Sequence, residues 1–347
     1  MGWSIGFGPA NGSAPLGELI RGTSRKWTRT LNRPDSFTVQ LDGRSDLTAA
    51  MAELETDLFI RRDGVALSRL RVAVPSQSLT PAAHHVTIPA FDYTWILESR
   101  LLAAGDTVLH QAAQDQADIA WRLVNATQGR SGGALGVTQG THGFTAGAGN
   151  TGVVRDRDYE AGDVIAKRLA ELAAVIGGFD YEIDAALKLQ VYYPTKGQSI
   201  GRILDFGGAV TSLDVSGNAA GFANVVYVQG SDKVLPVYQA TAGVGTDARG
   251  RWEDTFSYST VSEQATIQQK ADGLLAERSR IPRSYKFKMR RGAWGGPAQL
   301  DTGDTVRIMA KSGPGLQVNA TARVMAITVA LDEHGDEDVE VTAEQTT

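Results

Sequence analysis

The sequence lacks cysteine entirely among its 347 residues. This absence excludes disulfide bridges, cysteine-ligated zinc, iron–sulfur clusters and a cysteine nucleophile. No uninterrupted apolar run approaches the roughly 18 residues that a membrane-spanning helix requires. Residues 1–7 place no basic segment ahead of a long apolar one, so we expect no signal peptide and a protein that is made in soluble form.

The chain also has little net charge. Its 34 basic and 39 acidic residues leave a formal charge of -5, too small to indicate a nucleic-acid or membrane-surface binder. A hydrophobic content of 42% is enough for a substantial core. The 39 glycines and 11 prolines favour many turns over long helices. The length indicates two or three domains.

Alternation of apolar and polar residues predicts β-strands throughout the first third. The predicted strands are 36–41, 57–62, 69–75 and 86–93. Asp63-Gly64 predicts a hairpin turn, because both central residues of a type I′ turn need a positive φ. Residues 1–20 are glycine-rich and weakly patterned, so we expect an arm that becomes ordered only on a partner.

The middle third changes character. It contains two predicted helices, 116–127 with Asp115 as N-cap and a second that Asp163 caps and Gly177-Gly178 ends. A predicted hairpin, 179–193, follows directly, so helix and hairpin form a compact α+β unit. Nine of the residues 129–152 are glycine, which predicts a long flexible loop without its own core.

The last third is again rich in predicted strands. These are 223–228, 285–290, 305–310, 318–331 and 339–343, with one helix at 261–280 and an acidic turn at 332–338. We therefore predict an α+β, mainly β fold with two small antiparallel β-barrel-like modules and an inserted helix-plus-hairpin α/β domain. The predicted parts are an arm (1–20), a first β-barrel module (21–97 with 198–235), the inserted domain (98–197) and a second β-rich module (236–347).

Two glycine motifs resemble catalytic or cofactor signatures. Residues 147–152 match G-x-G-x-x-G, but dinucleotide binding needs a strand before the motif and a helix directly after it. Residues 129–133 match G-x-S-x-G, but Ser131 leaves a predicted helix and enters a loop, whereas a nucleophile elbow joins a strand to a helix. Both matches are therefore interpreted as chance matches within a glycine-rich segment, and we expect no cofactor.

Histidines and acidic clusters give no metal signature. None of the five histidines has a second at the helical i, i+4 spacing; they are His84, His85, His110, His142 and His334. Asp332, Asp336 and Asp338 could suggest calcium, but Gly335 stands at the wrong place for an EF-hand loop. A solvated hairpin tip is the favoured interpretation. We expect no metal site and no catalytic residue.

Two basic clusters are the most distinctive candidate sites. Lys286, Lys288 and Arg290 alternate along one predicted strand, with Arg291 beside them. Such a face is typical of a solvated edge strand, or of docking to an acidic neighbour, or of a weak phosphate contact; we favour protein docking over nucleic acid. The second cluster, with the same alternatives, comprises Arg21, Arg25, Lys26, Arg29 and Arg33.

The order of elements resembles a known family. The opening 28–39, with its Leu-Asn-x-Pro turn and following strand, is similar to the start of bacteriophage minor tail proteins of the baseplate or tail-tip hub family. The helix and hairpin at 163–193, the strand 224–228 and the ending formed by 300–306 and 323–327 resemble that family as well. The resemblance covers roughly residues 20–347 and depends on the succession of elements.

The resemblance implies a structural virion protein at the tail tip, made in the host cytoplasm. Such hubs are homotrimeric rings in which two barrels per subunit mimic a six-fold ring, so a three-fold tip can join a six-fold tube. Implied partners are the tail tube or distal tail protein, the tape-measure protein and other tip proteins. DNA would pass through the bore without sequence-specific binding. The resemblance implies no enzymatic activity, and we expect no wall-degrading extension after Thr347.

Two other functions remain open. A receptor- or carbohydrate-binding tip protein needs exposed aromatic platforms, and four tryptophans lie in Gly- or Arg-rich segments where they could be exposed: Trp3, Trp27, Trp252 and Trp294. The same side chains could instead anchor barrel ends or subunit contacts. A hydrolase would use Ser131 or a carboxylate pair. The loop 129–152 could contact a neighbouring tip protein, or be disordered.

Overall fold

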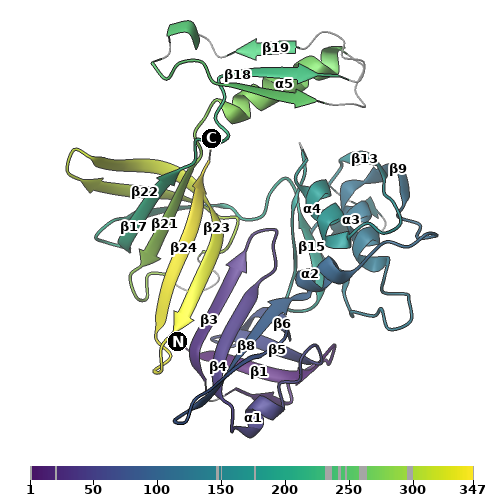
Figure 1. Ribbon diagram of the computed structural model, residues 1–347, viewed down its shortest axis with the longest axis vertical. Helices are drawn as coiled ribbons and strands as arrows, with labels where there is room; N and C mark the ends of the chain where they lie inside the picture. The colour runs from purple at the N-terminus through teal and green to yellow at the C-terminus, as the bar shows by residue number, and fades with distance from the viewer. Residues whose placement is uncertain are drawn as a thin grey trace. The chain divides into compact units, whose positions relative to one another are not determined.

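The chain folds into two compact units, each described here by itself. The computed structural model describes residues 2–19, 22–145, 148–149, 151–175, 177–230, 237–240, 244–246, 248–257, 264–294 and 300–346. The first unit comprises Met1–Leu213 and Lys286–Thr346, and the second comprises Asp214–Tyr285 (Figure 1). Most described elements are strands, so the predicted mainly β, α+β class is confirmed.

The first part of the first unit is a run of antiparallel strands. They are β1 (Trp3–Pro9), β2 (Gly17–Glu18), β3 (Thr23–Thr30), β4 (Ser36–Asp42), β5 (Thr56–Arg62), β6 (Val65–Val72), β7 (Ser76–Leu79) and β8 (His84–Asp92), with the short helix α1 (Asp46–Ala49). Alternate residues of β4 are buried, as period-2 patterning predicts. The predicted turn joins β5 and β6, with φ of 49° at Asp63 and 80° at Gly64.

Six more strands, from residue 199 onward, continue the same sheet. They are β16 (Ser199–Asp205), β17 (Val210–Gly217), β21 (Arg283–Met289), β22 (Thr305–Ser312), β23 (Leu316–Leu331) and β24 (Glu337–Gln345). The sheet runs in the order β17-β21-β24-β23-β3-β4-β8-β6-β5-β1-β2, with β22 and β16 branching from β23 and β7 from β8. Both halves curl. In the half that contains β16 and β17, a single β-bridge between Phe206 and Val210 connects the end of β16 to the start of β17.

Strand β23 belongs to both curls. Along one edge it pairs first with β22, over Leu316–Arg323, and then with β3, over Ala326–Leu331. Its opposite edge pairs with β24, with a bulge between Val324 and Ala326. Figure 1 shows β3 and β24 alongside β23. The two curled halves are therefore one hydrogen-bonded sheet.

Strand pairing corrects two predicted boundaries. The segment 1–20 was expected to be an arm ordered only by a partner, but β1 pairs with β5 along its whole length and Ile5 is buried. The segment 198–235 was expected in the first module, but β16 runs parallel to β22 and 214–235 belongs to the second unit. Alternation marks a segment as a strand without specifying its partner, so sequence could not assign these pairings.

The inserted region forms its own hydrophobic core. Its elements are α2 (Tyr93–Ile96), the 3-10 helix η1 (Leu97–Ser99), β9 (His110–Asp115), α3 (Gln116–Asn125), β13 (Val154–Asp158), α4 (Ile165–Ala173), β14 (Asp180–Ile183) and β15 (Lys188–Tyr192). Ile119, Leu123, Leu169 and Leu189 are buried in one cluster. The two predicted helices and the hairpin are present, but α4 ends at Ala173, before the predicted end at Gly177-Gly178. The exact limits of the inserted domain stay a prediction.

Described residues of the glycine-rich segment pack into the core of the inserted region. Leu135 and Val137 are buried in the inserted core. Strand β10 (Thr138–Gln139) pairs in parallel with β15, and β11 (Phe144–Thr145) pairs with β12 (Ala148–Gly149). The predicted loop has no core of its own, but these residues join the core of the inserted region, and its flexibility stays a prediction. Gly147 and Asn150 of the G-x-G-x-x-G match lie outside the described residues.

The second unit packs one helix against a small sheet. Strands β18 (Val225–Gln229), β19 (Val237–Ala240) and β20 (Glu253–Ser257) pair in the order β19-β18-β20. Helix α5 (Gln264–Arg278) buries Ile267 and Ala271 against Val226 and Val228. The predicted helix 261–280 is confirmed over α5, whereas 261–263 lie outside the described residues. The short 3-10 helix η2 (Val244–Thr246) completes this unit.

Membrane insertion through a helix finds no support in the structure. Within the described ranges, every helix is too short or too polar to cross a bilayer.

Candidate functional site

The turn between β3 and β4 binds the inserted hairpin. Asn32 adopts φ of 55°, a left-handed conformation that asparagine tolerates better than most residues. Its Nδ2 donates to Asp180 Oδ1 at 2.7 Å, and its Oδ1 accepts from the Tyr181 amide at 2.8 Å. The Leu-Asn-x-Pro turn that carries the family resemblance is therefore a connector between the sheet and the inserted region.

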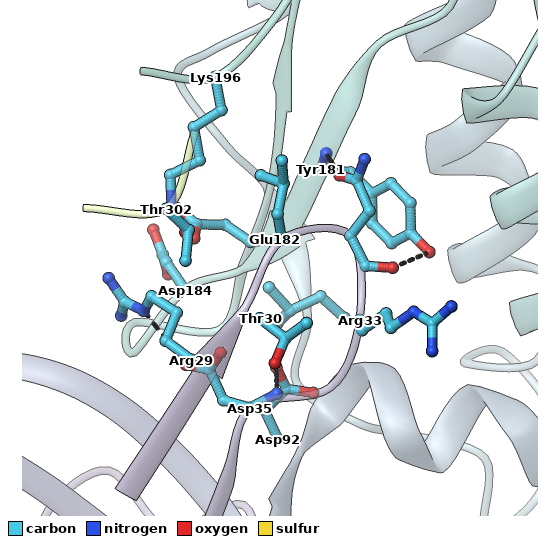
Figure 2. A pocket seen from close by; sticks show the side chains of 13 residues that line it. Arg29, Thr30, Arg33, Asp35, Asp92, Tyr181, Glu182, Asp184, Lys196 and Thr302 are labelled. Carbon is cyan, nitrogen blue, oxygen red and sulfur yellow. Dashed lines mark hydrogen bonds and ion pairs between the residues drawn. The ribbon is translucent and has the colours of Figure 1, made fainter. Parts of the chain in front are cut away.

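A set of buried and partly buried charged side chains continues this connection, and we call it the buried joint: Arg29, Asp35, Glu182, Lys196 and Asp301. Arg29 contacts Asp35 at 3.3 Å and Asp301 at 3.2 Å. Lys196 contacts Glu182 at 2.6 Å and Asp301 at 3.3 Å. Figure 2 shows the side chains of Arg29, Asp35, Glu182 and Lys196 converging from different segments. The buried joint thus links β3, the inserted hairpin and the 301–304 turn.

Two further aspartates lie against this joint. Asp92, the N-cap of α2, accepts from the Thr94 amide at 2.8 Å and from the Asp35 amide at 2.9 Å. Asp180 forms an ion pair with Arg323 and accepts from the Lys196 amide at 2.6 Å. Both carboxylates are buried, so each ties backbone segments that are distant in sequence.

The environment of the joint raises the pKa of two carboxyl groups and lowers the pKa of two others. Burial, with the nearby charge of Asp35, raises the pKa of Asp92 to about 8. Burial also raises the pKa of Asp35, against the opposing effect of Arg29. Burial alone would raise the pKa of Glu182 and of Asp301, but the charges of Lys196 and Arg29 hold both below their ordinary values. Asp92 is thus the carboxyl group most disposed to carry a proton.

The centre of the buried joint has no room for a substrate. The cavity among these side chains is about 10 Å³, space for about one water molecule. Ordinary small-molecule sites are larger by more than tenfold. The centre of the joint is therefore closed to a ligand, whereas Lys196 and Asp301 at its edge also line a neighbouring pocket of about 480 Å³.

The residues singled out for chemistry do not converge. Ser131 is exposed in a turn that follows α3, without the strand and helix that a nucleophile elbow needs. Among the described residues, no three histidine or acidic side chains are placed to hold a metal ion. Asp332 instead accepts from the amides of His334 and Asp336 within its own turn, at 2.9 Å and 2.8 Å.

The basic strand face is paired within the chain, and we call these ion pairs the surface ladder. Lys286 contacts Glu340 at 2.9 Å, Lys288 contacts Asp338 at 2.7 Å, and Arg291 contacts Asp336 at 2.7 Å. Arg290 donates to the carbonyls of Gly207 and Gly208 at 2.6 Å and 2.7 Å. The edge-strand interpretation is wrong, because β21 lies between β17 and β24. Docking of a partner here stays a prediction.

The second predicted cluster is divided by the fold. Arg25 donates to the Asp332 carbonyl at 2.6 Å, and Lys26 is exposed. Arg29 turns inward to the buried joint, whereas Arg33 is exposed. Arg21 lies outside the described residues. Docking through Arg21, Arg25 and Lys26 stays a prediction, and Arg29 is not available to it.

Three of the four tryptophans gather inside the first unit. The ring centroids of Trp3 and Trp27 are 5.9 Å apart, and those of Trp27 and Trp294 are 6.5 Å apart. The Arg62 guanidinium lies 4.5 Å from the Trp294 ring centroid and pairs with Glu337 at 2.5 Å. These contacts favour the anchoring interpretation. Trp252, in the second unit, is 50% exposed.

A buried carboxylate was missed by sequence reasoning. Asp57 is 0% exposed, and its Oδ1 accepts from Arg71 Nε at 2.6 Å while its Oδ2 accepts from Arg69 Nη2 at 2.7 Å. Tyr93 also donates to Oδ2, at 2.7 Å. The signal was two arginines at alternate positions of a strand whose other face is apolar. Such residues are ordinarily assigned to solvent.

Comparison with known proteins gives a likeness in structure and none in sequence. No family model matches the chain, and no curated protein matches it significantly. It is similar to the tail protein from Neisseria meningitidis (13% identity, TM-score 0.68, covering 99% of this chain and 97% of that one). It is also similar to the 43 kDa tail protein of prophage MuSo2 from Shewanella oneidensis (12%, 0.69, 98% and 97%).

A third likeness concerns the hub type. The chain is similar to the E. coli c3393 protein (10% identity, TM-score 0.53, covering 98% of this chain and 77% of that one). That protein is described as a type VI secretion component with structural similarity to the T4 bacteriophage tail proteins gp27 and gp5. The chain therefore has the fold of phage tail proteins. The family resemblance predicted from its order of elements is confirmed at the level of fold.

Proposed function

We propose that this chain is a structural, non-enzymatic virion protein that forms the hub of a phage tail tip. The observation that carries the proposal is the likeness in fold along 98–99% of the chain to two phage tail proteins and to a protein similar to gp27 and gp5. The buried joint supports this structural role, because its charged side chains form ion pairs with one another between chain segments.

In this proposal three copies form a closed ring. Each copy contributes two curled β-modules, and six modules present a six-fold surface to the tail tube while the ring itself stays three-fold. DNA passes through the bore without sequence-specific contacts. The tail tube or distal tail protein, the tape-measure protein and other tip proteins are the neighbours of the ring.

The mass of the assembly tests the proposal. We expect light scattering on the purified chain, or on a complex released from tail particles, to give three times the chain mass of 36.9 kDa. Mass spectrometry of purified tails should detect the chain. A stable monomer that is absent from purified tails would contradict both the trimer and the virion location.

A second function is favoured by one observation, the exposed Trp252. Its ring lies edge-on to Phe222, with centroids 6.2 Å apart, and its Nε1 donates to the Arg249 carbonyl at 2.7 Å. A ring held in place and open to solvent suits stacking on a sugar face. Binding on a glycan array that Trp252→Ala abolishes would support a carbohydrate-binding role for the second unit. Equal binding by wild type and variant would exclude this ring.

A further inference from the structure

A pocket of about 410 Å³ lies on the first unit, apart from the buried joint. Four parts of the chain line it: the turn at 11–13 after β1, the hairpin of β5 and β6, Gly136, and the 185–187 turn between β14 and β15. Its volume lies within the range of small-ligand sites, about 300–1,000 Å³. The pocket is therefore large enough for one or two amino-acid residues.

The charge of this pocket is opposite to that of the chain. Arg61 and Arg69 line it, and no aspartate or glutamate does so within the described ranges, although the whole chain carries a net charge of -5. Arg61 is exposed and forms no ion pair in the described part of the chain. Its guanidinium is thus available to an anion.

The second guanidinium is held in place and incompletely neutralised. Arg69 and Arg71 are both 8% exposed and share the single carboxylate of Asp57. Two positive charges against one negative charge leave an excess of one positive charge beside the pocket. Carbonyl groups of Gly12 and Leu54 accept from these arginines at 2.7 Å and 3.1 Å, but they carry no full charge. Buried charges are usually paired, so the excess favours an anionic ligand.

The remaining walls are mixed: Asn11, Ser13 and Ser68 are polar, and the other part is apolar. Phe59 lies under Arg69, with 4.9 Å from the guanidinium carbon to the ring centroid. Ile60, Ala66 and Leu187 also line the pocket. A bare inorganic anion or a nucleic-acid backbone would leave this apolar surface without a partner. The complement is an anionic group attached directly to an apolar body.

We propose that this pocket binds the carboxyl-terminal residue of a partner polypeptide. The terminal carboxylate accepts hydrogen bonds from Arg61 and Arg69, because a planar guanidinium matches the two oxygens of a carboxylate. The apolar side chain of the same residue packs on Phe59 and Leu187. A chain terminus supplies both groups within one residue, whereas an acidic side chain supplies mainly the charge. This inference does not depend on the tail-hub function.

Fluorescence anisotropy on the full-length protein tests the pocket. The probe is a fluorescein-labelled tetrapeptide, Gly-Ser-Ala-Leu with a free carboxyl terminus; the comparison peptides are its carboxyl-terminal amide and Gly-Glu-Gly amide. We expect a Kd of about 1 mM or lower for the free terminus. We expect binding at least about tenfold weaker for both amides, since a charge-assisted hydrogen bond is lost.

Arg61→Ala should weaken binding of the free terminus about tenfold, and it should leave folding unchanged because this side chain is exposed. Arg44→Ala is the matched control, an exposed arginine outside the pocket lining, and should bind as wild type. Equal binding of the free terminus and its amide would overturn the proposal. So would tighter binding of the glutamate peptide, or an Arg61→Ala variant with unchanged affinity.

Discussion

The buried joint and the surface ladder use the same side-chain chemistry in two different environments. In the joint, Arg29 and Lys196 have side chains 14% and 7% exposed. In the ladder, Lys286 and Lys288 are 52% and 46% exposed. Water and salt screen the ladder, so its ion pairs add little stability. In the joint, loss of one partner leaves a charge that water reaches only in part, since even the Glu182 and Asp301 side chains are only 25% and 32% exposed.

The two regions also differ in what they connect. The surface ladder joins two strands that already share a backbone ladder in the sheet order. The buried joint connects β3, the inserted hairpin and the 301–304 turn, which are distant in sequence. The ion pairs of the surface ladder are dispensable, because backbone hydrogen bonds already connect the same strands. The ion pairs of the buried joint are needed, because they connect segments that share few other bonds. The following predictions test this contrast.

The largest expected effect is in the buried joint. Arg29→Ala removes the cation paired with Asp35 and one of two cations paired with Asp301. We expect a loss of about 3–5 kcal/mol in the free energy of unfolding, because the buried Asp35 loses this charged partner while Asp301 keeps Lys196. Urea denaturation followed by tryptophan fluorescence measures this loss. The exposed Arg44→Ala serves as control and should unfold as wild type. A loss below about 1 kcal/mol, which is typical of surface ion pairs, would mean that the buried joint stabilises the fold no more than the surface ladder does.

The second prediction concerns pH. The pKa of Asp92 is raised from 3.8 to about 8, so its contribution to stability is fully present below its unfolded value and is lost as pH rises through about 8. We expect this group to lower stability progressively between about pH 4 and 8, with a slope of at most about 1.4 kcal/mol per pH unit. Asp92→Asn should flatten that slope in urea denaturation at several pH values.

The upper part of this range, about pH 6 to 8, separates Asp92 from Glu182 and Asp301. The pKa values of Glu182 and Asp301 are lowered, so their contributions are present above their ordinary pKa and are lost on acidification. They remain constant between about pH 6 and 8. An unchanged slope in Asp92→Asn would mean that Asp92 is ionised in the folded state throughout this window.

A smaller effect is expected at the connecting turn. Asn32→Gly retains the positive φ but removes hydrogen bonds to Asp180 and to the Tyr181 amide. We expect a loss of about 1–3 kcal/mol, since partly buried donors and acceptors are left unpaired. Asn32→Asp is the matched variant, because it keeps the acceptor for the amide while losing the donor. If both variants unfold as wild type, the turn does not hold the hairpin.

The smallest effect is expected in the surface ladder. Lys286→Ala removes a half-exposed partner of Glu340, and the urea midpoint should stay within experimental error of wild type. A clear loss of stability would show that the ladder is cooperative and would remove its difference from the buried joint.

Local patterns predicted much of the fold. Period-2 alternation identified the main strands, and Asp63-Gly64 identified a turn whose two residues have the positive φ it requires. Asp115 caps α3 as predicted, since its Oδ1 accepts from the Ala117 amide at 2.8 Å. These features depend on residues close in sequence, so they can be derived from sequence.

Competing and distant partners could not be predicted. Asp163 was expected to cap α4, but the cap position is Val164. The carboxylate of Asp163 instead contacts Arg168 at 2.6 Å and the Glu160 amide at 2.8 Å. Likewise, the alternation of β6 placed Arg69 and Arg71 on a polar face, and only the approach of Asp57 explains their burial. Such partners depend on how segments far apart in sequence meet.

The long strand β23 has a mechanical consequence. Its first half pairs with β22 and its second half pairs with β3. On the opposite edge β24 pairs with both sides of the bulge between Val324 and Ala326. The two curls therefore share one continuous length of backbone, with no linker at which a hinge could form. Tension applied to either curl passes along covalent bonds into the other, and separating them requires tearing a whole row of hydrogen bonds at once.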